Sequence, residues 1–360
     1  MAFFRLQKLA FSIAAACLAA GSTHALAADA AQSKAAVIKT AAASAKQGAV
    51  KKLGAGSKSA KAVKTSLQKP QKKAVKKVAK RKVRRTAPSQ ATLAGLRNTE
   101  DPLLLGSSVA YAIDQDTGEE LVAKNADVQL PIASVTKLMT ALVIAESDLP
   151  LNEKIRITRE DHVRSTARSK LWNGMRVTRE ALLKAALMSS DNRAAHALAR
   201  TYPGGKKAFI AKMNERAAEI GMTDSVFADP TGLDNRNNAT AKDLARLVAA
   251  VYQHQEIREA STQSIARIST GKRSVKLVTT NRLIGDPSWR IGIQKTGFTT
   301  AAGRCMVVQS DIGDRRLVMV VLDSPTSAVR ANDMRTMRAY VAAEERFNKE
   351  FASVTPYEIF

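Results

Sequence analysis

Apolar side chains recur at helical spacing along five stretches of this chain. After Ser134 they lie three and four positions apart, which predicts a buried helix with Ser134 in its first turn. Thr178 and Thr240 precede two other stretches and are expected as N-caps, with Asp243 in a capping-box-like position. A third stretch should stop at Gly221. The further helices are predicted over residues 179–188, 206–220, 241–252 and 333–347.

Short runs of β-branched and apolar residues predict strands near both ends of the same region. Residues 108–113 and 120–123 flank the turn-forming segment 114–118, which indicates a β-hairpin. Because strands come first and last with helices between them, the sheet should be built from both ends. This order predicts an α/β fold with a helical insertion and disfavours a parallel βαβ repeat. The later strands are expected over residues 274–280, 290–296, 304–309 and 317–322.

The first 27 residues have the pattern of a secretory signal. Arg5 and Lys8 precede an apolar stretch, and Ala25-Leu26-Ala27 offers a small-x-small cleavage site. The apolar stretch is shorter than the roughly 20 residues of a membrane-spanning helix, which argues against an uncleaved anchor. We therefore expect a cleaved signal peptide over 1–27 and a periplasmic mature protein. Cleavage leaves Cys305 as the single cysteine, so an apolar core must hold the fold.

Residues 28–95 differ from the rest of the chain in composition. Eighteen Lys and Arg lie between Lys34 and Arg85, which is most of the net charge of +25, and aromatic residues are absent. Such a segment buries too little apolar surface to offset the cost of ordering, so a disordered basic tail is expected. It is either a solvated spacer or an electrostatic attachment to an anionic wall or membrane surface. No aromatic platform or base-reading motif indicates a specific nucleic acid partner.

Ser134 and Lys137 form a Ser-x-x-Lys pair. One helical turn apart, they would face the same side, and a Lys among apolar neighbours loses proton affinity and can accept the Ser proton. The motif is weak alone, because Ser66 to Lys69 and Ser269 to Lys272 share it. The alternative is a helix-capping Ser beside a Lys that extends to solvent.

Two further clusters lie where this chemistry would need them. Ser190-Asp191-Asn192 follows an apolar helical run, and Lys295-Thr296-Gly297 ends an apolar strand. With residues 134–137 they make three motifs, in this order, that form a specific signal. Here the chain resembles the penicillin-recognising serine enzymes, and in particular the D-alanyl-D-alanine carboxypeptidase and endopeptidase family of low-molecular-mass penicillin-binding proteins.

The resemblance covers residues 99–340 and implies the fold. It predicts a penicillin-binding-protein/β-lactamase-like α/β architecture, an antiparallel sheet flanked by helices with a helical insertion. Residues 96–360 would form a single serine DD-peptidase catalytic domain acting on peptidoglycan peptides and binding β-lactam inhibitors. No cofactor or metal is implied. The matching segments are residues 133–141, 188–195, 229–233, 240–244 and 295–303.

The resemblance also implies catalytic roles. Ser134 would attack the carbonyl of a D-alanyl peptide bond, Lys137 would take its proton, and water would hydrolyse the acyl-enzyme. Ser190 would relay a proton to the leaving amine, and Asn192 would hold Lys137 and the substrate backbone. Asp191 is expected to be a solvated position without a catalytic role.

The third motif is assigned to substrate binding. Lys295 would supply positive charge and Thr296 a hydroxyl to a substrate carboxylate, while Gly297 lets the strand backbone come close. The backbone N–H groups of Ser134 and Phe298 would form the oxyanion hole.

The bond that is cut depends on the branch of the family. Carboxypeptidases of this family commonly carry a second β-rich domain and an anchor, whereas 63 residues follow Gly297 and are filled by two strands and a helix. We therefore favour an endopeptidase that hydrolyses D-alanyl to meso-diaminopimelyl cross-links. The alternatives are a carboxypeptidase that removes terminal D-alanine and, from another class, a non-catalytic cell-wall-binding scaffold.

Other hydrolase classes fit less well. A β-lactamase needs a Glu-bearing loop for fast deacylation, and no convincing Glu-x-x-x-Asn stretch lies between Ser190 and Lys295. No Gly-x-Ser-x-Gly elbow is present for a Ser-His-Asp triad. His162, His196 and His254 lack metal-ligand spacing and are expected to be surface or packing residues.

Overall fold

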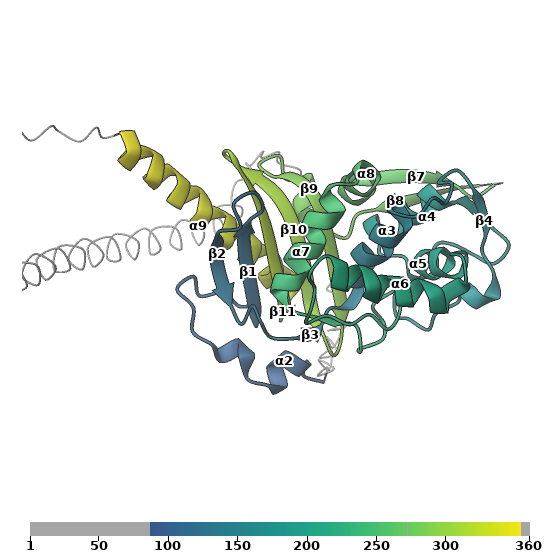
Figure 1. The fold of residues 1–360 in the computed structure, drawn as a ribbon, viewed down its shortest axis with the longest axis horizontal. Helices are drawn as coiled ribbons and strands as arrows, with labels where there is room; N and C mark the ends of the chain where they lie inside the picture. Colours follow the sequence, from purple (N-terminus) through teal and green to yellow (C-terminus); the bar gives the residue numbers. More distant parts are fainter. Residues whose placement is uncertain (1–86, 272, 354–360) are drawn as a thin grey trace, which may run out of the picture.

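The centre of the molecule is a five-stranded sheet. The structure, a computed structural model, describes residues 87–271 and 273–353, so the expected signal peptide and nearly all of the basic tail lie outside it. All neighbouring strands are antiparallel, in the order β2-β1-β11-β10-β9 (Figure 1), which confirms the predicted fold class. The strands are β1 (Val109–Asp114), β2 (Glu120–Lys124), β9 (Arg290–Thr299), β10 (Gly303–Ile312) and β11 (Arg315–Ser324).

The two ends of the domain meet in this sheet. Strand β1 pairs with β11, so that Tyr111 lies opposite Val320. The expectation of a sheet built from both ends is therefore confirmed. One predicted strand does not join it: β8 (Ser274–Val278) pairs with β7 (Ile265–Ser269) as a separate hairpin. The sequence signal for a strand was correct here, but it carried no information about the pairing partner.

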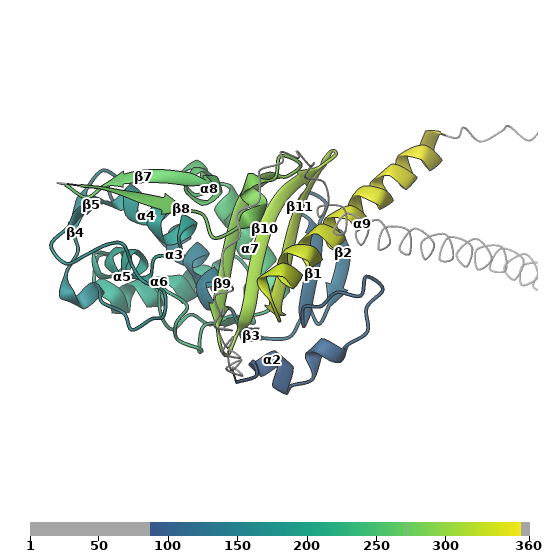
Figure 2. The same ribbon diagram turned by 180° about the vertical axis from the view of Figure 1, so that it is seen from behind.

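Helices cover both faces of the sheet. On one face lies the long helix α9 (Ser327–Ser353) (Figure 2). Its Met334 belongs to the same buried cluster as Met306 and Met319 of the strands. On the other face lies α7 (Ala241–Tyr252), which contacts β11, β10, β1 and β9. The sheet is thus apolar on both sides, which explains the nearly continuous apolar sequences of β10 and β11.

The remaining elements form a helical region beside the α7 face. At its centre is α3 (Lys137–Ala145), in which eight of nine residues are buried. A helix that is apolar all round requires neighbours on every side, and here α4, α5, α6, α7 and α8 supply contacts. These helices are α4 (Arg179–Met188), α5 (Asn192–Arg200), α6 (Gly205–Glu219) and α8 (Gln255–Thr262). The short strands are β3 (Leu130–Pro131), β4 (Lys154–Arg156), β5 (Arg176–Thr178) and β6 (Asn238–Ala239).

The predicted caps are confirmed, with one difference. The side chains of Thr178 and Thr240 accept hydrogen bonds from the backbone N–H three residues on, at the starts of α4 and α7. The carboxylate of Asp243 does not turn back to complete a capping box. It accepts instead from the Asp224 N–H and the Ser225 hydroxyl, and so attaches a distant loop to α7.

The folded region begins earlier than residue 96. Helix α2 (Gln90–Leu93) lies inside the segment predicted as tail, and its Ala91 is 1% exposed within the core. Ser89 caps this helix, and the Gln90 N–H donates to the Ala301 carbonyl oxygen. The expected tail boundary at 95 is therefore wrong by several residues, because composition alone does not show this local capping signal. No helix within residues 87–353 is both long and apolar enough to cross a membrane.

Candidate active site

Ser134 and Lys137 lie at the junction between a short turn and a buried helix. Ser134 is in the 3₁₀ turn η2 (Ala133–Thr136), immediately before α3 rather than within its first turn. Lys137 is the first residue of α3 and is fully buried. Its Nζ lies 2.9 Å from Ser134 Oγ. The structure therefore contradicts the alternative of a Lys that extends to solvent.

Three oxygen atoms surround the Lys137 amine. Besides Ser134 Oγ, Nζ donates to Asn192 Oδ1 at 2.7 Å and to the Thr231 carbonyl oxygen at 2.6 Å. A neutral amine has two N–H groups and one lone pair, and the Asn192 and Thr231 oxygens can only accept. The lone pair must then face Ser134 Oγ. A base that takes the Ser134 proton would need this geometry.

Burial prepares the same amine for that role. It lowers the pKa of Lys137 to about 7, against the opposing influence of the carboxylates of Asp229 and Asp191. Desolvation disfavours the ammonium form, so a substantial fraction of the amine is neutral near neutral pH. A base with a pKa close to the working pH transfers protons efficiently.

A second buried lysine, Lys295, enters the site from β9. Its Nζ donates to Ser190 Oγ at 2.9 Å and to the Thr296 carbonyl oxygen at 2.7 Å. Burial lowers the pKa of Lys295 well below its usual value, and the positive charges of Lys137 and Arg330 add to this shift. Thr296 Oγ1 lies 2.6 Å from Thr280 Oγ1, so the hydroxyl of the third motif is also held in place.

Close backbone packing joins the sheet to the turn that bears Ser134. A Cβ atom at Gly297 would lie 3.0 Å from both Ser134 N and the Ile132 carbonyl oxygen, so a larger residue would press on these backbone atoms and move β9 away by a few tenths of an ångström. Ala133 and Ser190 both adopt positive φ, at 48° and 56°. Such backbone conformations are rare for residues with a side chain and occur often at functional sites.

The arrangement matches a known family. A family model described as D-alanyl-D-alanine carboxypeptidase matches residues 97–326, well over half of the chain. The chain belongs to the D-alanyl-D-alanine carboxypeptidase family. This confirms the resemblance to the low-molecular-mass penicillin-binding proteins and identifies the chain as a serine DD-peptidase.

Individual relatives agree with the family match. A D-alanyl-D-alanine endopeptidase of Pseudomonas aeruginosa is 41% identical over 224 residues, 61% of this chain and 72% of the relative. A D-alanyl-D-alanine endopeptidase of Escherichia coli is 34% identical over 261 residues, 71% and 83% of the two chains. Among solved structures, the Streptomyces K15 DD-transpeptidase has a TM-score of 0.62 at 28% identity, covering 66% of this chain and 98% of its own. Ampicillin-bound penicillin-binding protein D2 of Listeria monocytogenes has a TM-score of 0.59 at 30% identity, covering 66% and 98%.

The DD-peptidase fold brings the predicted site residues into two groups, and the residues within each group are in contact. Ser134, Lys137 and Asn192 form one group, and Ser190 and Lys295 the other, with Thr296 and Gly297 following on β9. The Phe298 side chain is 51% exposed and packs under the Arg304 guanidinium, 4.7 Å from the ring centroid. Its predicted contribution is a backbone N–H and does not depend on that side chain.

Three residues of the site carry no role in the sequence-based prediction. The Thr231 carbonyl oxygen contacts Lys137, Ser165 Oγ accepts from Asn192 Nδ2 at 3.0 Å, and Thr280 contacts Thr296. Thr231 lies in a segment that the family resemblance did include, and the adjacent Gly232 leaves no room for a Cβ beside the Ala133 carbonyl. No comparable signal marks Ser165 or Thr280.

Asp191 is not the solvated position that the sequence suggested. It is 7% exposed, and its carboxylate caps α5 by accepting from the Arg193 and Ala194 N–H groups. It also accepts from Ser169 Oγ and from the Lys170 N–H. Asp191 is therefore a structural residue that holds Ser190 and Asn192 at the start of a helix and ties a loop to them.

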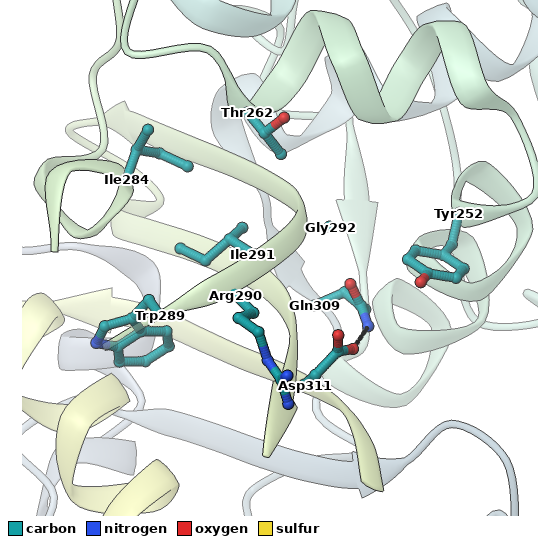
Figure 3. A pocket seen from close by; sticks show the side chains of 9 residues that line it. All are labelled: Tyr252, Thr262, Ile284, Trp289, Arg290, Ile291, Gly292, Gln309 and Asp311. Atoms are coloured by element: carbon teal, nitrogen blue, oxygen red, sulfur yellow. Dashed lines mark hydrogen bonds between the residues drawn. The ribbon is translucent and has the colours of Figure 1, made fainter. Parts of the chain in front are cut away.

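A separate cavity of about 400 Å³ lies at the opposite end of β9 (Figure 3). Arg290 and Asp311 line it, and Gln309 Nε2 donates to Asp311 Oδ1 at 3.3 Å. It contains none of the motif residues. Across residues 87–271 and 273–353, no three His, Cys, Asp or Glu side chains form a group that could hold a metal ion.

Proposed function

We propose that the protein is a periplasmic D-alanyl-D-alanine endopeptidase that hydrolyses D-alanyl to meso-diaminopimelyl cross-links through a Ser134 acyl-enzyme. The decisive observation is the position of Lys137 Nζ, 2.9 Å from Ser134 Oγ with both of its other partners able only to accept. This is the geometry that an activated serine requires without histidine. The endopeptidase names of the relatives with 41% and 34% identity favour this branch.

The proposed acylation transfers one proton around the site. Ser134 Oγ attacks the D-alanyl carbonyl carbon as its proton moves to Lys137 Nζ. The backbone N–H groups of Ser134 and Phe298 stabilise the negative charge on the carbonyl oxygen. Collapse of this intermediate breaks the C–N bond. Ser190 gives its hydroxyl proton to the departing amine and receives the proton that Lys137 took from Ser134, so Lys137 is neutral again. Water then attacks the ester, releases the D-alanyl carboxylate and restores Ser134.

Lys295 and Thr296 would bind a carboxylate of the substrate. A carboxylate beside Lys295 favours the ammonium form and so counteracts the burial that lowers its pKa in the free protein. A β-lactam carboxylate would use the same contacts while Ser134 opens the lactam ring. Penicillin binding by this chain follows from the proposal, as in the ampicillin-bound Listeria structure.

Two alternatives compete with the endopeptidase. A carboxypeptidase is supported by the description of the family and by relatives of that name, including one of Bacillus subtilis at 31% identity. A non-catalytic scaffold should have lost at least one residue of the set, whereas all are present and Ser134, Lys137 and Asn192 are in contact.

The proposal includes export and attachment. Residues 1–27 would direct secretion, and the basic residues between 34 and 85 would hold the enzyme at an anionic wall or membrane surface by charge. A flexible tether raises the local concentration of enzyme at its polymer substrate.

The test is digestion of purified cross-linked muropeptide dimers and monomeric pentapeptides, with products identified by mass spectrometry. We expect dimers to become monomers while pentapeptides remain, and Ser134→Ala to be inactive. Release of terminal D-alanine alone would establish the carboxypeptidase, and penicillin binding without either product would establish the scaffold. Removal of residues 28–86 should reduce activity on intact sacculi more than on soluble dimers; equal effects would refute the tether.

A further inference from the structure

A cavity of about 300 Å³ adjoins the catalytic centre on the side of Asn192. One wall is the start of α5, and the other is the loop that precedes β5. Asn192 connects the cavity to the catalytic centre, because its Oδ1 accepts from Lys137 Nζ while its Nδ2 donates to Ser165 Oγ, another lining residue. The lining includes His162, Ser165, Arg168, Ser169, Asn192 and Arg193.

The lining is basic and has no acidic member. Arg168 and Arg193 both line the cavity, and neither forms an ion pair with a carboxylate among the residues that the structure describes. Arg193 uses one N–H on the Leu171 carbonyl oxygen, while its buried Nε has no hydrogen-bond partner in the described part of the chain. No hydrogen bond to a described residue involves the Arg168 guanidinium or Nη2 of Arg193, so these donors remain for a ligand acceptor.

Asp191, which precedes Asn192 in the chain, forms no ion pair with these arginines. The two oxygens of Asp191 accept from Ser169 Oγ and from backbone N–H groups of the loop and of α5. They are 2.8–3.2 Å from those donors and are directed at the helix start. The positive charge of Arg168 and Arg193 is therefore left for a ligand.

The loop that carries Arg168 is fixed relative to the catalytic groups. Ser169 and Lys170 bind the Asp191 carboxylate, and Lys170 Nζ donates to the Lys276 carbonyl oxygen of β8 at 2.6 Å. Ser165, in the same loop, accepts from Asn192 Nδ2. The cavity is thus built from segments that the active site itself positions, which is what a substrate subsite requires.

We propose that Arg168 and Arg193 form an anion subsite that binds a free carboxylate of the peptidoglycan stem peptide, one or two residues before the scissile bond. This proposal rests on the proposed function, because the stem peptide is the substrate of that reaction. Guanidinium groups match carboxylates through paired N–H donors, and such charge-assisted bonds discriminate strongly against a neutral amide. The subsite therefore selects acidic stems over amidated ones.

Two carboxylates of the stem have the required chemistry. One is the α-carboxylate of its D-glutamyl residue, and the other is a carboxylate of the diaminopimelyl residue. Stems amidated at only one of these positions distinguish the two sources. The same chemical change, carboxylate to carboxamide, alters charge with almost no change in size.

The experiment measures two quantities for each stem: kcat/KM for dimer cleavage, and protection of the full chain from acylation by a fluorescent penicillin. We expect the wild-type protein to prefer the free-carboxylate stem over one singly amidated stem by about tenfold or more, the size of a charge-assisted hydrogen bond. Arg168→Gln combined with Arg193→Gln removes both positive charges and should reduce that preference to about twofold. Arg290→Gln, which removes an exposed arginine at the distant cavity of Figure 3, should leave it unchanged.

The outcomes separate this proposal from the proposed function. Equal use of free and amidated stems by the wild-type protein, or an unchanged preference in the double variant, would overturn the anion subsite. Absence of dimer cleavage would overturn the endopeptidase, while the protection assay would still report whether acidic stems bind better. Thermal melting of each variant shows whether it remains folded.

Discussion

Lys137 and Lys295 are two fully buried lysines that differ in what surrounds them. One begins a helix and the other lies in a strand, and burial lowers the pKa of both. Carboxylates of Asp229 and Asp191 partly restore the proton affinity of Lys137. Positive charges of Lys137 and Arg330 lower that of Lys295 further. The two amines are therefore equally buried but differ in the charges that set their proton affinity.

The hydrogen-bond partners assign the two amines to different tasks. Lys137 faces the nucleophile with its other directions filled by Asn192 and Thr231, so its lone pair has one target. Lys295 contacts Ser190 and a backbone carbonyl, and it gains a favourable charge partner only when a carboxylate arrives. We infer that the first lysine moves a proton and the second binds charge.

Removing each amine in turn should have the largest effect and tests whether the two lysines have different roles. Lys137→Met should reduce the rate of penicillin acylation by roughly a thousandfold, within the range of a lost general base. Lys295→Met should reduce the same acylation rate by about ten- to a hundredfold, which corresponds to the loss of one charge-assisted hydrogen bond. Methionine keeps most of the side-chain volume in both cases. Stopped-flow acylation measures both rates, and melting temperatures verify folding; equal losses would contradict the division of tasks.

A smaller effect is expected from the carboxylate that most favours protonated Lys137. Wild-type acylation should rise with pH through about 7 as Lys137 loses its proton. Asp229→Asn removes a negative charge that stabilises the ammonium, so the pKa of Lys137 falls and the rise moves to lower pH. At pH 6 the rate, as a fraction of its plateau, should increase roughly two- to fivefold, because one pKa unit is tenfold in neutral amine.

A matched control is available in the same loop. Asp234 pairs with Arg236 at the surface and does not contribute to the pKa of Lys137. Asp234→Asn should therefore leave the pH profile in place. A profile of Asp229→Asn that moved to higher pH, or not at all, would show that Asp229 acts on Lys137 only by holding the loop.

The sequence predicted one lysine environment better than the other. Ser134, Lys137 and Asn192 could be placed together because each lies in a motif, and the structure shows their contact. The contact of the Thr231 carbonyl oxygen with Lys137 could not be predicted, because a backbone oxygen has no sequence signature. The two residues are also 94 positions apart in the chain. Helix α8 and strand β7 were missed because both are short and bury few side chains: Ile257, Ala260 and Ser261 in α8, and Ile268 in β7. The prediction for Asp191 was wrong because the sequence alone does not distinguish an aspartate that caps a buried helix start from one that is exposed to solvent.

That misjudged residue gives the smallest and sharpest test of the comparison. Asp191 is the second carboxylate that favours protonated Lys137, and it contributes less than Asp229. Asn is as good an N-cap as Asp, so Asp191→Asn should keep the start of α5. The substitution removes the charge and also one of the two oxygens that bind Ser169 Oγ and the Lys170 N–H, so the melting temperature is measured to verify that the loop stays in place. The acylation profile should then move to lower pH by less than with Asp229→Asn, with under twofold change at pH 6. A larger shift than that of Asp229→Asn would place the dominant negative field at the start of α5, on the side of Asn192.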